Sequence, residues 1–234
     1  MCRPKRRLQM SKLPIVSESA AAAKATAAAD ARRPPLPLVG ATFETGAAAP
    51  SQLPTDGAPE VAFAGRSNSG KSSAINALAR QTRLAFASRT PGRTQLINFF
   101  RLRGGARIAD LPGYGYAAVP RALKKDWQDF LWTYVTTRTA LVGLVLVVDA
   151  RHGLRTMDEQ LLGGFLPSGR PVLILATKID KLNQAEGRAA VASIGDRLRE
   201  VFPEHASAVG VVPFSGPSRL GIEEADAVIA PWIA

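Results

Sequence analysis

The stretch from Gly65 to Ser72, Gly-Arg-Ser-Asn-Ser-Gly-Lys-Ser, constrains the fold of this chain more than any other part of the sequence. It follows an apolar run at residues 60–64 that is typical of a buried strand, and it precedes apolar residues at helical spacing over 73–79. A strand, a glycine-bearing turn and a helix start direct several backbone N–H groups at one place, where the helix dipole also favours an anion. The sequence therefore predicts a loop that binds nucleotide phosphates.

The residue types in this loop have separate expected roles. Gly65 and Gly70 allow the chain to curl closely around phosphate oxygens. Lys71 can reach the β and γ phosphates, and the hydroxyl of Ser72 can ligate Mg²⁺. The alternative is a chance match in a glycine-containing turn. The expected nucleotide-binding set is the whole loop: Gly65, Arg66, Ser67, Asn68, Ser69, Gly70, Lys71 and Ser72.

A second motif, Thr177-Lys178-Ile179-Asp180, indicates which base is bound. It directly follows the apolar run 171–176, so it lies at the carboxyl end of a predicted parallel strand, where open α/β sheets bind ligands. The carboxylate of Asp180 only accepts hydrogen bonds, and guanine offers two donors on one edge, whereas adenine offers no such pair. The apolar stem of Lys178 could lie over the base plane. The alternative is an ordinary polar strand end.

Two further loops complete the predicted pocket. Asp110, Leu111, Pro112 and Gly113 form an Asp-x-x-Gly motif after a short strand that begins at Arg107. Asp110 can hold Mg²⁺ through a water molecule, and the N–H of Gly113 can approach the γ-phosphate because no side chain intervenes. A loop of Phe214, Ser215 and Gly216 follows the strand 211–213, and its N–H groups could bond guanine O6.

With these motifs in order, the chain resembles the EngB-type ribosome-biogenesis GTPases, also known as the YihA or YsxC type. The resemblance is carried by residues 62–73, by Ser-Arg-Thr-Pro-Gly-Arg-Thr-Gln at 88–95, by Asp-Leu-Pro-Gly-Tyr-Gly-Tyr at 110–116 and by residues 177–180. It extends from about residue 41 to residue 233. The second and third of these strings are far more specific than the phosphate loop alone.

The resemblance implies a Ras-like G domain over residues 41–234. This is a doubly wound α/β fold, expected here as a mostly parallel six-stranded sheet with one antiparallel edge strand and helices on both faces. The resemblance also implies that Thr94 is the second protein ligand to Mg²⁺ when GTP is bound. It extends the expected GTP contacts to Gly92, Arg93, Thr94, Gln95 and Leu96, and it assigns catalytic roles to Lys71, Thr94 and Gly113.

The family implies a cytoplasmic molecular switch that hydrolyses GTP to GDP and phosphate during assembly of the large ribosomal subunit. It also implies contact with that subunit and its rRNA, and a need for the protein in normal cell division and septation. Two alternatives stay open. One is a GTP-binding interaction module whose hydrolysis is incidental, and the other is a related GTPase in tRNA modification or ion transport.

One departure from Ras-type GTPases bears on the rate. They place a water-orienting glutamine directly after Asp-x-x-Gly, whereas this chain has Tyr114, so we expect slow intrinsic hydrolysis. Asn68 stands where potassium-stimulated relatives carry an asparagine, and a K⁺ ion there could neutralise developing charge. Arg93 as a finger in cis and Gln95 as a water-orienting group are alternatives.

Composition fits a single domain without a membrane segment. A chain of 234 residues with 46% hydrophobic content can bury one α/β core, and its longest apolar run, 140–148, is half of what a membrane span needs. The single cysteine, Cys2, suits a reducing compartment. The net charge of +11 suggests a polyanionic partner, and no interface pattern argues against a monomer.

Positive charge is concentrated at the start of the chain. Residues 1–34 contain eight Lys or Arg and two acids, a net charge of +6. We therefore expect residues 1–40 to be a disordered, basic, Ala/Arg-rich extension, which could touch RNA or simply be solvated. Its content loosely resembles an organelle transit peptide, and Met10 offers an alternative translation start.

The remaining elements follow from periodicity. We expect strands at 95–102 and 141–149 and helices near 121–137, 157–165, 184–201 and 222–233. Loops 81–96 and 110–123 should respond to the nucleotide state. Six cations in or beside these loops form a plausible basic face for ribosomal RNA, or an ordinary charged surface: Arg83, Arg89, Arg93, Arg121, Lys124 and Lys125.

Overall fold

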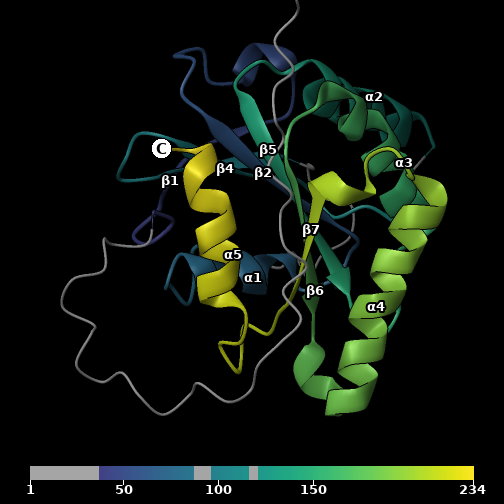
Figure 1. Cartoon of the computed structure of the whole chain (residues 1–234). Coiled ribbons are helices and arrows are strands. Elements are labelled where there is room, and N and C mark those ends of the chain that lie inside the picture. Colours follow the sequence, from purple (N-terminus) through teal and green to yellow (C-terminus); the bar gives the residue numbers. More distant parts are fainter. Residues whose placement is uncertain (1–36, 87–95, 116–120) are drawn as a thin grey trace, which may run out of the picture.

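A twisted seven-stranded sheet with helices on both faces forms the described part of the chain in the computed structural model (Figure 1). The description covers residues 37–86, 96–115 and 121–234, without the side chains of 121–128. The strands are β1 (Thr42–Ala47), β2 (Glu60–Gly65), β3 (Ile97–Arg101), β4 (Arg107–Asp110), β5 (Leu141–Asp149), β6 (Val172–Thr177) and β7 (Val209–Pro213). The helices are α1 (Lys71–Leu78), α2 (Arg121–Thr137), α3 (Thr156–Phe165), α4 (Gln184–Val201) and α5 (Ile222–Ile229).

The strands are ordered β1-β3-β4-β2-β5-β6-β7 across the sheet. Neighbours from β4 to β7 run parallel, and β3 runs antiparallel to both β4 and β1. The parallel strands therefore all present their carboxyl ends at one edge, which is where the predicted motifs lie.

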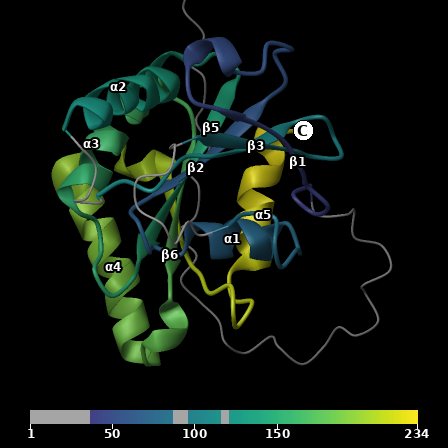
Figure 2. The ribbon, with the colours of Figure 1, turned by 180° about the vertical axis from the view of Figure 1, so that it is seen from behind.

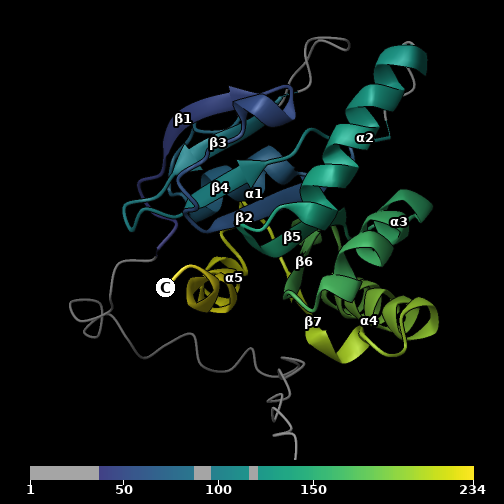
Figure 3. The same cartoon turned by 90° about the horizontal axis from the view of Figure 1, so that it is seen from above.

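Two hydrophobic cores cover the two faces of the sheet. Helices α1 and α5 pack side by side on one face, and α2, α3 and α4 lie on the other (Figures 2 and 3). In β2, Val61 and Phe63 point into the first core, whereas Ala62 and Ala64 point into the second. Strands buried on both faces carry apolar residues at every position, which is why their runs in the sequence are continuous.

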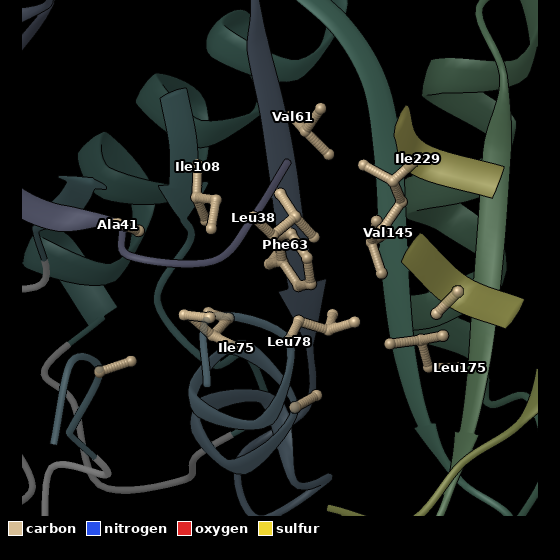
Figure 4. Packing of buried hydrophobic residues seen from close by; sticks show 14 of the residues in the cluster. Leu38, Ala41, Val61, Phe63, Ile75, Leu78, Ile108, Val145, Leu175 and Ile229 are labelled. Atoms are coloured by element: carbon tan, nitrogen blue, oxygen red, sulfur yellow. The ribbon is translucent and has the colours of Figure 1, made fainter. Parts of the chain in front are cut away.

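The first core includes residues from the start of the described part of the chain (Figure 4). Phe63 of β2 lies among Ile75 and Leu78 of α1, and Leu38 packs beside it with no exposed surface. Leu38 precedes residue 41, where the G domain is predicted to begin, yet it belongs to this core. Residues 1–36 lie outside the described part, so the division of the chain at 40/41 stays a prediction.

The doubly wound α/β fold is confirmed, with two corrections to its sheet. We predicted six strands, and the described residues form seven. The antiparallel strand β3 is not the edge, because β1 pairs along its outer side. The missed strand, Thr42–Ala47, is largely exposed and contains Gly46, so it lacks the continuous apolar run of a central strand. Its register with β3 is irregular between Phe43 and Thr45.

Most predicted bounds agree with the structure. Those of α2, β5 and α4 coincide with the predicted ranges. The last helix was predicted to run to residue 233, but α5 ends at Ile229 and continues as a short 3-10 helix, Ala230–Trp232. Pro231 lies in that segment, and its ring cannot donate the N–H that an α-helix needs. Among the described helices, none is long and apolar enough to span a membrane.

Candidate functional site

The phosphate loop connects β2 to α1, as the sequence predicts. Gly65 is the last residue of β2, and Lys71 is the first residue of α1. Gly70 has a φ of 99°, in the left-handed region that favours glycine. A Cβ on Gly65 would lie 2.6 Å from the carbonyl oxygen of Val147, so only glycine fits there. The two glycines are therefore required by the close curl of this loop.

Lys71 and Asp110 form an ion pair at the carboxyl ends of the adjacent strands β2 and β4. Their side chains are only 10% and 7% exposed. Burial raises the pKa of the Asp110 carboxyl, and the neighbouring Lys71 ammonium acts in the opposite direction. The lysine expected to bind phosphate and the carboxylate expected to face Mg²⁺ thus meet at one point.

The segment after β4 runs beside the phosphate loop. The N–H of Ser67 donates to the carbonyl of Tyr114 over 2.9 Å, and the N–H of Tyr114 donates to the carbonyl of Gly65 over 3.3 Å. A Cβ on Gly113 would lie 3.2 Å from the backbone nitrogen of Ser67. Leu111 is buried, and the neighbouring Pro112 is half-buried. Gly113, the expected contact of the γ-phosphate, therefore lies directly against the loop.

Thr177 and Lys178 connect the guanine motif to the phosphate loop. Thr177 ends β6, and its hydroxyl donates to the carbonyl of Ser69. Lys178 has a φ of 59°, and its ammonium donates to the carbonyl of Asn68 over 2.5 Å. The same ammonium lies 2.9 Å from a carboxylate oxygen of Asp149. The long stem of Lys178 thus bridges the two motifs; its predicted position over a base stays a prediction.

Asp180 follows in a 3-10 turn, Ile179–Lys181. Its Oδ1 accepts a hydrogen bond from the hydroxyl of Ser215 over 2.7 Å, and its Oδ2 lies 3.3 Å from the ammonium of Lys181. The bond from Ser215 lowers the pKa of the Asp180 carboxyl, which therefore stays ionised and can only accept hydrogen bonds.

The loop after β7, Phe214 to Gly216, lies against the guanine motif. The side chain of Phe214 is buried in the core, so only its backbone can face a ligand. Its N–H donates to the carbonyl of Ala176 over 2.8 Å, and its carbonyl accepts from the N–H of Ile179 over 3.4 Å. The two loops predicted to hold the base are therefore joined by backbone and side-chain bonds.

The residues present fit a magnesium ion. Ser72 and Asp110 offer hydroxyl and carboxylate oxygens, the hard ligands that Mg²⁺ prefers. The described residues contain no group of three or more His, Cys, Asp or Glu that could hold a metal unaided. Mg²⁺ usually takes one or two protein oxygens together with substrate phosphates and waters.

Part of the predicted site lies outside the described residues. This holds for Gly92, Arg93, Thr94 and Gln95, whose roles stay predictions. Leu96 is described, and its Cδ1 lies 3.0 Å from where a Cβ on Gly46 would be, so this side chain faces the edge strand β1. Of the predicted basic face, Arg83 is exposed. The others fall outside the description, either whole (Arg89, Arg93) or by their side chains (Arg121, Lys124, Lys125).

Sequence reasoning missed Asp149, at the carboxyl end of β5. Arg151 donates to both of its carboxylate oxygens, over 2.9 and 2.7 Å. Burial alone would raise the pKa of the Asp149 carboxyl, but hydrogen bonds from Arg151 and Lys178 hold it well below its usual range. Asp149 lines a cavity of about 310 Å³ beside the phosphate loop. Its place at the end of a parallel strand was the signal that could have found it.

Three comparisons with known proteins bear on this site. Residues 60–178 match the family described as 50S ribosome-binding GTPase. The probable GTP-binding protein EngB of Azoarcus sp. strain BH72 is 49% identical over 193 residues, which cover 82% of this chain and 91% of the relative. That of Thiobacillus denitrificans is 50% identical over 194 residues, covering 83% and 91%.

A solved structure is similar as well. The crystal structure of a probable GTP-binding protein EngB matches with a TM-score of 0.59 and 23% identity, covering 74% of this chain and 98% of that one. At this identity the match supports the arrangement of strands and helices, whereas the family assignment depends on the sequence relatives.

Proposed function

This chain belongs to the EngB family of P-loop GTPases, a GTP-binding and GTP-hydrolysing family, and from that premise we propose that it acts as a molecular switch in assembly of the large ribosomal subunit. The observation that best supports a single nucleotide site is the contact between its motifs. Thr177 and Lys178 of the guanine motif bond to carbonyls of the phosphate loop. One GTP molecule would therefore engage both.

The proposed reaction is in-line attack of water on the γ-phosphate of GTP. The ammonium of Lys71 and the N–H groups of the phosphate loop would stabilise charge on the phosphate oxygens. Lys71 would exchange its bond to Asp110 for the phosphates when the nucleotide enters. Asp180 would accept from N1–H and the 2-amino group of guanine. Gly113 would bring its N–H to the γ-phosphate.

Members of this class of enzyme use Mg²⁺, which supplies neutralisation of the developing negative charge. Ser72 and Asp110 would hold it, the latter through water, together with Thr94. The position of a water-orienting glutamine is occupied by Tyr114, which offers no carboxamide. We therefore expect slow intrinsic hydrolysis.

A potassium ion held by Asn68 could supply part of the missing charge stabilisation. Asn68 has a φ of 65°, so replacement by alanine adds backbone strain to loss of the carboxamide. Asn68→Gly removes the carboxamide without that strain. If the ion binds there, both variants lose any rate advantage of K⁺ over Na⁺ buffer. A wild-type rate that is equal in the two buffers contradicts the idea.

The partner we propose is the large ribosomal subunit, contacted through its rRNA by a cytoplasmic monomer. The net charge of +11 favours such a polyanion. Loops on either side of β3 and β4 that change with the nucleotide would make this contact depend on GTP. Effects on cell division and septation would follow from ribosome supply.

The deciding experiment measures GTP hydrolysis by the purified full chain, with and without large ribosomal subunits. Stimulation by the subunits that is absent in Lys71→Ala supports a ribosome-coupled switch. Small subunits serve as the control polyanion, and equal stimulation by them would indicate non-specific binding. Tight GTP binding without any stimulation would favour an interaction module, the alternative that Tyr114 supports.

A further inference from the structure

Tyr114 takes the place of the water-orienting glutamine, and its side chain reaches helix α3. Its hydroxyl donates to Oδ1 of Asp158 over 2.6 Å. Burial raises the pKa of this hydroxyl well above its usual value, and the nearby Asp158 adds to the rise, so the hydroxyl keeps its proton. Tyr114 is therefore a fixed donor in a bond between two distant parts of the chain.

Asp158 is held from its other side. It is only 2% exposed, and its Oδ2 accepts a hydrogen bond from the N–H of Arg155 over 2.9 Å, in the first turn of α3. A carboxylate that accepts at both oxygens has a single orientation. The guanidinium of Arg66 interacts electrostatically with both members of this pair. Helix α3 thus provides a rigid support for the tyrosine.

Backbone hydrogen bonds of Tyr114 connect its contact with α3 to Gly113, the residue expected to meet the γ-phosphate. Its carbonyl accepts from Ser67 and its N–H donates to Gly65, so residue 114 is fixed to both ends of the loop's first turn. Gly113, the preceding residue, lies so close to Ser67 that a side chain would meet that residue's Cα at 3.2 Å. A small movement of Tyr114 would therefore displace the N–H of Gly113.

We propose that Tyr114 and Asp158 are positioning residues that raise the affinity for GTP relative to GDP. Their hydrogen bond holds Gly113 against the phosphate loop before the nucleotide arrives, so its N–H meets the γ-phosphate without reorganisation. GDP has no γ-phosphate and gains nothing from this arrangement. The inference rests on the proposed nucleotide site and assigns residue 114 a positioning role in place of water activation.

The test compares dissociation constants of GTP, as a non-hydrolysable analogue, and of GDP for the full chain. Tyr114→Phe removes only the hydroxyl, and Asp158→Asn removes one of the two acceptors. In each variant, affinity for the GTP analogue should fall about tenfold, the effect of one partly buried hydrogen bond to a charged group, while affinity for GDP stays within twofold. The double variant should lose no more than the larger single loss, because both substitutions act on the same contact between residues 114 and 158.

The control is Glu186→Gln, at the equivalent position in the first turn of α4. Oε2 of Glu186 accepts from the N–H of Asn183 over 2.9 Å, and the residue is exposed. Its melting temperature should fall as in Asp158→Asn, but its preference for the GTP analogue should be that of the wild type. A purely structural Asp158 would give the same pattern as this control.

The outcomes separate this inference from the proposed function. If the wild type binds neither nucleotide, the proposed site fails. If it binds both, and Tyr114→Phe and Asp158→Asn keep the wild-type ratio of GTP-analogue to GDP affinity, the site stands and the positioning role is wrong. Should one variant not fold, the ratio measured in the other decides.

Discussion

The two ends of strands β2 and β4 carry different residues. Glu60 and Arg107 stand at the amino-terminal ends and are almost fully buried, and Gly65 and Asp110 stand at the carboxyl ends. Glu60 accepts from the guanidinium of Arg138 over 2.9 Å and from the hydroxyl of Tyr134 over 2.8 Å. Every one of these polar groups at the amino-terminal end is matched by a partner from the protein itself.

Arg107 extends this network to the edge of the sheet. Its guanidinium donates to both carboxylate oxygens of Glu44 and of Asp56. Arg101 joins the same two carboxylates from β3. The network connects β1, β3 and β4 with the loop before β2, so its charges serve to hold strands together.

At the carboxyl ends of the strands, charged side chains also form ion pairs, but a ligand could take the place of one partner in each pair. Lys71 bonds to Asp110, and Lys178 bonds to Asp149, but each lysine lies beside a loop whose N–H groups can take an anion. Backbone at this end is held in left-handed conformations at Asn68, Gly70 and Lys178. The contrast indicates that one end of the sheet stabilises the fold and the other keeps charges available to a ligand.

The largest effect should come from Lys71→Ala at the ligand end. The variant should lose about a thousandfold in kcat/KM for GTP, roughly 4 kcal/mol, because charge on the phosphate oxygens loses its cationic partner. The measurement is phosphate release under single-turnover conditions. Arg188→Ala, which removes an exposed cation from α4, should keep the wild-type rate. Equal losses in both variants would mean that the overall charge matters more than the site.

Asp180→Asn should follow, with about a hundredfold loss of GTP affinity, roughly 2.7 kcal/mol. The amide replaces one of the two acceptors for guanine by a donor. Xanthosine triphosphate, which has a carbonyl in place of the 2-amino group, should bind the variant better than the wild type. Asp196→Asn, at an exposed position on α4, is the control. Binding titration with both nucleotides checks the exchange, and unchanged GTP affinity would place the base elsewhere.

Glu60→Gln tests the opposite end. The free energy of unfolding should fall by about 2 kcal/mol, because Arg138 loses its anionic partner in a buried setting. Urea unfolding at neutral pH measures this, with exposed Glu204→Gln as the control. Nucleotide affinity of folded Glu60→Gln should stay at the wild-type value. A loss of affinity equal to that of Asp180→Asn would remove the distinction between the two ends.

Asp226 on α5 differs from the paired groups Glu60 and Arg107, because its Oδ1 is buried without a hydrogen-bond partner in the described structure. Burial raises the pKa of this carboxyl to about 6. The folded state therefore binds a proton that the unfolded state releases, and stability should rise as pH falls from 7 towards 4. Asp226→Asn should flatten this dependence and add about 1 kcal/mol at pH 7.5. Melting temperatures across that pH range give the test; an unchanged slope would mean that Asp226 is ionised throughout.

The parts that were predictable from sequence are those encoded by neighbouring residues. A continuous apolar run predicts strand β5, and glycines and a lysine at fixed spacing predict the phosphate loop. Edge strand β1 carries no such run, because one of its sides faces solvent. The burial of Leu38 was hidden for a related reason: it depends on a contact with Phe63 in another part of the chain.

Pairings across long separations were equally hidden. Tyr134 and Glu60 are 74 residues apart, and Tyr114 and Asp158 are 44 apart. The sequence showed Tyr134 only as a residue of the helix predicted near 121–137, without its polar partner. In the site, residue types predicted the chemistry of each loop, but only the fold showed that Lys178 reaches Asn68.

The bond between Lys178 and the phosphate loop has a consequence for how ligand fragments bind. Lys178 of the guanine motif bonds to the phosphate loop, so the two parts of the site are held next to each other. Binding of the guanosine part of GTP therefore holds its triphosphate part at a high effective concentration over the phosphate loop. Guanosine and inorganic triphosphate, offered as separate molecules, should then bind far more weakly than GTP. The difference in binding free energy measures how rigidly the guanine motif and the phosphate loop are held relative to each other.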